Sequence, residues 1–162
     1  MNKINLAVEI IPFSPELAGD FKRVNEEWIE ELFEMEQADK DILDSPQELI
    51  IDKEGKILFA RDSKLGVIGA CALLKKSDNV YELTKMGVLK KARGLKAGEQ
   101  LLKHTLKLAK QMEIQTLYLL TNKKCEAAIH LYLKFGFRHD ELIMEQYGSL
   151  YERCNVAMRY VP

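Results

Sequence analysis

Residues Met86–Gly98, MGVLKKARGLKAG, decide the fold of this chain. A stretch typical of a β-strand, NVYELTKMGVL (79–89), runs into them, and an amphipathic stretch, EQLLKHTLKLAK (99–110), follows at once. A glycine-bearing loop that turns into a helix presents unpartnered backbone N–H groups and about half a positive charge at the helix start. The stretch therefore predicts a strand, an anion-binding turn suited to a phosphate and a helix in direct succession.

The residues after this loop extend the pattern to a crossover unit. Apolar side chains recur at helical spacing over residues 98–112, and IQTLYLLT (114–121) is a nearly continuous apolar run, as in a strand buried on both faces. Strand, loop, helix and strand in this order predict two parallel strands joined by a helix. A second helix, CEAAIHLYLKF (125–135), is expected to stop at Gly136, a favourable helix-ending residue.

The rest of the chain predicts further strands and helices around this unit. A strand is expected over NLAVEIIPF (5–13), and a helix from Ser14, with Ser14 as N-cap and Pro15 in its first turn. A short helix beside a connection is expected over residues 34–50. An antiparallel meander is predicted for KILFARD (56–62), VIGACALLKK (67–76) and 79–89, and two closing strands for ELIMEQYG (141–148) and NVAMRYVP (155–162).

Length and charge restrict the class of protein. A chain of 162 residues suits a single domain over residues 1–162. Its 24 basic and 25 acidic residues leave a net charge of −1, which argues against general binding to nucleic acid or to anionic membranes. The three cysteines form no close pair, so reduced thiols and a cytoplasmic location are predicted. The N-terminal apolar segment is far shorter than the ~20 residues that span a bilayer.

Several other site types lack their sequence signatures. His104, His130 and His139 are scattered and show no ligand spacing with a cysteine, so no metal site is predicted. The Gly-x-Ser-x-Gly pattern of serine hydrolases and the Gly-x-Gly-x-x-Gly pattern of dinucleotide-binding folds are also missing from the sequence.

Two motifs together resemble the GNAT superfamily of acyl-CoA-dependent N-acyltransferases. The family loop Arg/Gln-x-x-Gly-x-Gly/Ala is met by RGLKAG (93–98), except that Lys96 replaces the middle glycine, and the family pattern Leu-Tyr-x-x-x-Gly-Phe is met by LYLKFGF (131–137). The resemblance implies an α+β fold with a central, mostly antiparallel twisted sheet of six to seven strands, a parallel, splayed central pair and about four flanking helices. It also implies acetyl-CoA as co-substrate and an amine as acceptor.

The resemblance assigns the coenzyme contacts to particular positions. The main chain of Met86, Gly87 and Val88 would pair with the pantetheine arm, because an extended amide ligand can satisfy a splayed strand edge. The pyrophosphate would lie on Arg93, Gly94, Leu95, Lys96, Ala97 and Gly98. Where the family often has an asparagine that contacts the coenzyme this chain has Cys125, and Asn122 is the candidate in its place. Lys96 can still offer its N–H if its backbone is helical, and its ammonium adds charge near the phosphates.

The catalytic assignments also follow from the resemblance. Tyr132 matches the tyrosine that acts as general acid toward the leaving thiolate, and Glu82 matches the general base of some members. Core packing for Tyr132 and a merely exposed strand position for Glu82 are the alternatives. The predicted reaction is direct transfer of an acetyl group to a primary amine of a small molecule or peptide in a ternary complex; the alternative is a non-catalytic acyl-CoA-binding or sensing module.

The acceptor is predicted only in outline. The acid-rich segment Trp28–Asp44 would attract a cationic acceptor such as a polyamine or a lysine-like amine, or would simply be a solvated face. Exposed strands near the C-terminus permit a homodimer.

Overall fold

The structure, a computed structural model, describes residues 8–162. The strands are β1 (Val8–Pro12), β2 (Lys56–Asp62), β3 (Gly66–Ser77), β4 (Val80–Val88), β5 (Thr116–Thr121), β6 (Phe137–His139) and β7 (Val156–Tyr160). The α-helices are α1 (Ala18–Leu32), α2 (Gln37–Asp44), α3 (Ala97–Gln111), α4 (Glu126–Lys134) and α5 (Glu141–Tyr147). Shorter helical turns are η1 (Pro15–Leu17), η2 (Gln47–Ile51), η3 (Lys90–Ala92) and η4 (Gly148–Leu150).

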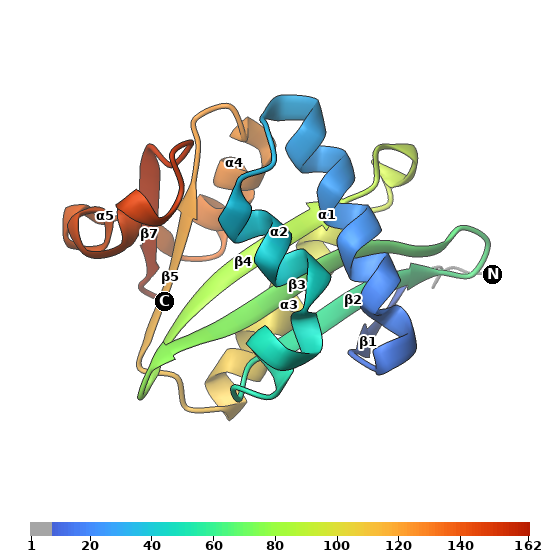
Figure 1. The fold of residues 1–162 in the computed structure, drawn as a ribbon, viewed down its shortest axis with the longest axis horizontal. Helices are drawn as coiled ribbons and strands as arrows, with labels where there is room; N and C mark the ends of the chain where they lie inside the picture. Colours follow the sequence, from blue (N-terminus) through green and yellow to red (C-terminus); the bar gives the residue numbers. More distant parts are fainter. Residues whose placement is uncertain (1–7) are drawn as a thin grey trace.

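The strands form one sheet in the order β1-β2-β3-β4-β5-β7-β6. Its neighbours are antiparallel except for β4 and β5, which are parallel, so the predicted mixed fold with a parallel central pair is confirmed. The parallel pairing joins only Val80–Glu82 to Thr116–Tyr118. Beyond it the two strands diverge (Figure 1), and the edge of β4 that faces β5 has no strand partner from Leu83 to Val88 within the described chain.

Helices cover both faces of this sheet. In Figure 1, α1 and α2 lie in front of β3 and β4, and α3 lies behind them. On the α1 face, Phe21, Val24 and Ile29 are fully buried, and on the α3 face Leu101 and Leu102 are. These residues recur at helical spacing, so each helix buries one apolar stripe against the sheet. Within residues 8–162, no helix is both long enough and apolar enough to cross a membrane.

The prediction of a closing strand over residues 141–148 is wrong, because most of this segment forms α5. The carboxylate of Asp140 caps the helix by accepting a hydrogen bond from the backbone N–H of Ile143, at 3.1 Å. Ile143 is buried against Tyr118 of β5. The edge strand next to β7 is instead the short β6, which directly follows Gly136. Residues 8–162 therefore contain five α-helices, where about four were expected.

The other boundaries lie close to the predictions. The predicted strand over residues 5–13 is β1, and its first residues, 5–7, lie outside the described part of the chain. Ser14 makes no side-chain capping bond; it precedes η1, and α1 begins only at Ala18. Residues 34–50 contain α2 and most of η2. Gly136 follows α4 with φ +108°, a left-handed backbone that glycine adopts without strain, as its predicted helix-ending role requires.

Candidate functional site

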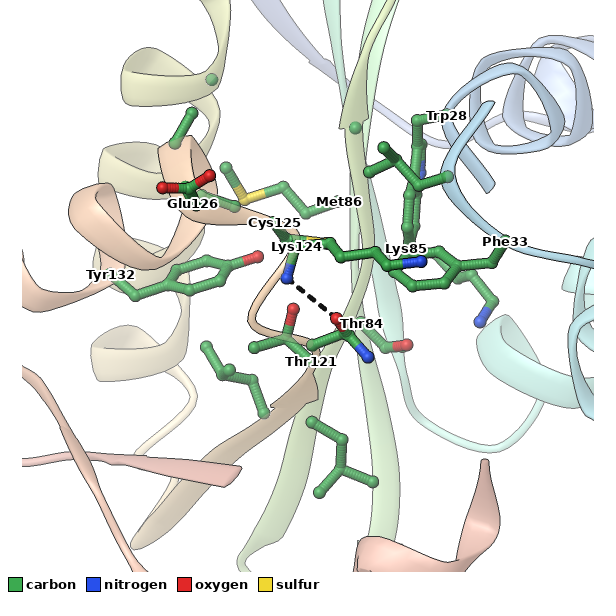
Figure 2. A pocket seen from close by; sticks show the side chains of 18 of the residues that line it. Trp28, Phe33, Thr84, Lys85, Met86, Thr121, Lys124, Cys125, Glu126 and Tyr132 are labelled. Carbon is green, nitrogen blue, oxygen red and sulfur yellow. Dashed lines mark hydrogen bonds between the residues drawn. The ribbon is translucent and has the colours of Figure 1, made fainter. Parts of the chain in front are cut away.

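A cavity of about 540 Å³ opens where β4 and β5 diverge. Both diverging strands line it, through Leu83–Val88 and Leu119–Asn122, together with residues of α1, α4 and the loop after η4. Figure 2 shows Tyr132 entering from one side with its hydroxyl pointing into the cavity, and Trp28 and Phe33 on the opposite side. The splayed sheet therefore creates a site whose walls come from distant parts of the chain.

The edge of β4 is shaped by a bulge and by a tryptophan. Lys85 has φ +51°, and the register with β3 shifts at this point, so β4 bulges just before Met86. A Cβ on Gly87 would lie 2.2 Å from Cδ1 of Trp28, which explains the glycine: the indole packs directly on the backbone. The indole N–H donates to Oδ1 of Asn25 at 2.8 Å, and Asn25 is fully buried. Trp28 is thus held in place as a wall beside the predicted pantetheine positions.

Only some of the residues predicted to bind the pyrophosphate, in the loop before α3, line the cavity. Arg93 and Gly98 line the cavity, whereas Gly94, Leu95, Lys96 and Ala97 do not. Gly98 leaves the start of α3 open, because even a Cβ there would only touch side chains of β4 and α4 at 3.7–3.8 Å. The helix start and one guanidinium therefore face the cavity, as an anionic group on a ligand requires.

Tyr132 is 6% exposed and lies edge-on to Phe137, with ring centroids 5.7 Å apart. Burial raises the pKa of its phenol, so the hydroxyl stays protonated at neutral pH. Because the ring packs in the core while the hydroxyl points into the cavity, the two roles considered for Tyr132 are both compatible with its position.

Glu82 lies outside the cavity lining and is 1% exposed, so it is not the exposed strand residue of the alternative interpretation. Its Oε1 faces the hydroxyl of Tyr118, at 3.4 Å. Burial raises the pKa of the Glu82 carboxyl, and the nearby charge of Lys85 opposes this rise. Contact between this carboxylate and a ligand in the cavity requires an intervening group.

Asn122 lines the cavity but is committed to local hydrogen bonds. Its Nδ2 donates to the carbonyl of Arg153 at 2.6 Å, and its Oδ1 accepts from the backbone N–H of Lys124 at 2.8 Å. Cys125 lines the cavity beside it. Asn122 therefore shapes the loop after β5 and joins it to the loop before β7.

A buried ionic cluster at the other end of the cavity was not predicted from the sequence. The fully buried Asp39 accepts four hydrogen bonds, from Nζ of Lys85 at 2.8 Å, from Nη1 and Nη2 of Arg153 at 2.6 Å each, and from the backbone N–H of Glu36 at 2.9 Å. Nζ of Lys85 also donates to the hydroxyl of Tyr151, at 2.9 Å. Lys85, Tyr151 and Arg153 line the cavity. Within residues 8–162 no group of His, Cys, Asp or Glu side chains is arranged to hold a metal ion.

This geometry agrees with the comparison to known protein families. The family model described as "Acetyltransferase (GNAT) family" matches residues 20–137, most of the chain and all of the splayed-strand site except the loop that carries Tyr151 and Arg153. The chain belongs to this family. No curated protein matches the chain at a significant level.

Solved GNAT structures share the whole fold at low sequence identity. A GNAT-family acetyltransferase from Staphylococcus aureus has a TM-score of 0.82 at 22% identity, covering 95% of this chain and 98% of its own. An acetyltransferase from Streptococcus agalactiae has a TM-score of 0.78 at 18% identity, with coverage of 96% and 99%. The PaiA N-acetyltransferase of Thermoplasma acidophilum, solved in complex with coenzyme A, has a TM-score of 0.71 at 17% identity, with coverage of 97% and 100%.

Lys96 departs from the GNAT loop pattern at a residue whose backbone is left-handed. Its φ is +60° and its ψ is +26°. The backbone N–H that Lys96 was expected to offer to a phosphate required a right-handed helical backbone at this residue, and this condition is not met. The side chain is exposed and does not line the cavity. The left-handed backbone explains why the family motif has a glycine here, because glycine adopts this conformation without strain. Lysine at this position strains the backbone.

We expect Lys96→Gly to raise the free energy of unfolding by up to about 1 kcal/mol, because glycine adopts the left-handed region without strain. Denaturant unfolding measures the change. Lys103→Gly, at an exposed position inside α3, is the matched control and should lower stability by about 1 kcal/mol. A destabilised Lys96→Gly protein would contradict the strain argument.

Proposed function

We propose that the protein transfers an acetyl group from acetyl-CoA to a primary amine of a small molecule or peptide, directly and within a ternary complex. The observation that carries the proposal is that the unpaired edge of β4, the start of α3 and the hydroxyl of Tyr132 all face one cavity. An extended pantetheine arm fits the strand edge, and the pyrophosphate fits the helix start beside Arg93. The coenzyme A bound to the Thermoplasma relative agrees with this use of the fold.

In this proposal Tyr132 is the general acid. Bound acetyl-CoA supplies the activated thioester, and its sulfur leaves as a thiolate that needs a proton. Tyr132 retains its proton at neutral pH, because burial raises the pKa of the phenol, and the hydroxyl is directed into the cavity. Positioned proton transfer of this kind typically contributes 10²–10⁴-fold to a rate.

Glu82 is proposed as the general base, acting through a water molecule. A carboxyl with a raised pKa is a better proton acceptor than an ordinary glutamate, and burial raises the pKa of Glu82. Thr84 lies two positions along the same strand and lines the cavity. The proposed coenzyme contacts remain Met86, Gly87 and Val88, the loop from Arg93 to Gly98, and Asn122.

Steady-state release of free coenzyme A tests the proposal. With acetyl-CoA and a panel of primary amines, we expect release that depends on the amine and saturates with it, and the same assay on Glu82→Gln across pH tests the base. Tight binding of acetyl-CoA without amine-dependent release would instead support a non-catalytic acyl-CoA-binding or sensing module. A missing thermal shift with millimolar acetyl-CoA would contradict both, because a ligand at ~100 times its Kd stabilises by ~2.7 kcal/mol.

A further inference from the structure

Among the acidic residues that suggested a cationic acceptor, Glu31, which lines the cavity, and Glu36 and Asp39, which lie outside its lining, already have hydrogen-bond or ion-pair partners. The four hydrogen bonds to Asp39 use both carboxylate oxygens. Glu36 accepts from the backbone N–H groups of Glu152 and Arg153, at 2.8 and 3.2 Å. Outside the cluster, Glu31 forms ion pairs with Lys90 and Arg93 at 3.0 and 3.4 Å. No carboxylate oxygen of Asp39 is left to receive an amine.

Hydrogen-bond donors remain at this end of the cavity. Tyr151 lines it and is 8% exposed, and its oxygen accepts from Nζ of Lys85. The hydroxyl proton must then point away from Lys85, and it meets no acceptor among the described residues. Burial raises the pKa of this phenol even though the charge of Lys85 opposes the rise, so Tyr151 is a donor at neutral pH.

Two cations, Arg153 and Lys124, lie beside the ring of Phe33 at this end of the cavity. The guanidinium of Arg153 lies 4.8 Å from the ring centroid of Tyr151 and 5.5 Å from that of Phe33. Nζ of Lys124 lies 5.5 Å from the same Phe33 centroid, and no carboxylate of residues 8–162 is within ion-pair distance of it. Phe33, Lys124 and Arg153 also line an adjoining open groove, which carries the acidic side chains Glu30, Glu31, Glu34, Glu36 and Glu152. The cations therefore stand between the inner cavity and this outer groove.

We propose that Tyr151 and Lys124 bind a carboxylate of the acceptor, so that the preferred substrates are amines that carry a carboxylate, such as amino acids. The proposal rests on the proposed acetyltransferase function and names its acceptor class. A carboxylate would receive the unused O–H of Tyr151 and a charge-assisted hydrogen bond from Lys124. The amine of the same molecule stays free to face the thioester. A polycationic amine meets these groups as like charges.

Matched pairs of amines test the acceptor class: phenylalanine against phenethylamine, and lysine against cadaverine. With saturating acetyl-CoA, the member with the carboxylate should have a kcat/KM about tenfold higher or more, as expected for a hydrogen bond to a charged group. Equal or better use of phenethylamine and cadaverine would overturn the proposal while leaving the acetyltransferase function intact. No release with any amine would count against the acetyltransferase function.

Variants locate the binding groups. Tyr151→Phe keeps the ring and should lower kcat/KM for phenylalanine about tenfold, with little change for phenethylamine. Lys124→Met should do the same and weaken the salt dependence, whereas the control Lys123→Met, a neighbouring lysine outside both cavities, should change neither. An equal loss for both amines in Tyr151→Phe would overturn the assignment.

Binding measured without turnover separates the two proposals. 3-Phenylpropionate has the ring and the carboxylate but no amine, so it cannot be acetylated. In the presence of coenzyme A it should raise the Tm of the wild-type protein, and the shift should be smaller in Tyr151→Phe and Lys124→Met. No shift in the wild-type protein would overturn the carboxylate site even if other amines are acetylated.

Discussion

Asp39→Asn is expected to lower the free energy of unfolding by about 3–5 kcal/mol, the range seen when one partner of a buried ion pair is removed. The side chains of Asp39 and Lys85 are 0% and 2% exposed, and that of Arg153 is 14% exposed. An amide in place of the carboxylate leaves two buried cations facing hydrogen-bond donors. Denaturant unfolding measures the loss, and the lining of the acceptor end of the cavity should loosen with it.

A surface pair provides the matched control for this substitution. Asp44 pairs with Lys22 at 2.7 Å, but their side chains are 56% and 45% exposed. Asp44→Asn should therefore cost less than about 1 kcal/mol, because water screens an exposed pair. If Asp39→Asn lost no more than Asp44→Asn, the cluster would not stabilise the fold.

The pH dependence of stability gives a second measurement on Asp39. Burial alone would raise the pKa of this carboxyl, but the hydrogen bonds from Arg153 and the charge of Lys85 lower it to about 2, from an ordinary 3.8. A carboxylate with a lowered pKa stabilises the folded state above its unfolded pKa, and this contribution disappears as the pH falls through the folded pKa. The difference in stability between the wild type and Asp39→Asn should therefore be constant near neutral pH and shrink between about pH 4 and pH 2.

Tyr132→Phe is expected to lower kcat about 100-fold or more, the lower end of the range for a positioned general acid. The substitution keeps the ring and its edge-on contact with Phe137, so the fold and the affinity for acetyl-CoA should be retained. The loss should appear in kcat rather than in the KM for acetyl-CoA, because the proton is needed only as the thiolate leaves.

Another buried tyrosine is the control for this loss. Tyr81 is 8% exposed, donates to the carbonyl of Glu54 at 3.0 Å, and does not line the cavity. Tyr81→Phe should leave kcat unchanged. If Tyr132→Phe also retained nearly full kcat, water would be the proton donor and the acid role of Tyr132 would be lost.

The central part of the fold was predictable because its signals are local. The loop after β4, the helical spacing in α3 and the apolar run of β5 each define their own conformation, and together they require a parallel crossover. Helix α5 was missed because its pattern is short, and the residue that starts it, Asp140, acts as a cap only in the folded backbone. The left-handed backbone of Lys96 could likewise not be predicted from its own side chain. The glycine that the family motif has at this position did indicate such a backbone.

Much of the cavity lining was predictable, and the ionic cluster beside it was not. Met86–Val88, Arg93, Gly98, Asn122 and Tyr132 line one cavity, whereas Glu82 lies outside it. The cluster of Asp39, Lys85 and Arg153 joins residues more than a hundred positions apart, and no local pattern pairs them. One signal was available: Asp39 lies one helical turn before the buried Leu43, which places a carboxylate on the apolar face of α2.

Because β4 and β5 diverge, the two ends of the cavity are built largely from different segments of the chain. The positions proposed to contact the coenzyme lie in one stretch of the chain, residues 86–132, whereas the opposite end of the cavity combines residues 28–39 and 151–153 with Lys85, just before that stretch, and Lys124, within it. Substitutions in those outer segments can change which acceptor enters while the coenzyme contacts keep their sequence. Under the proposed function, coenzyme use and acceptor choice can therefore change independently through these outer segments, which gives protein engineers a short set of positions to vary.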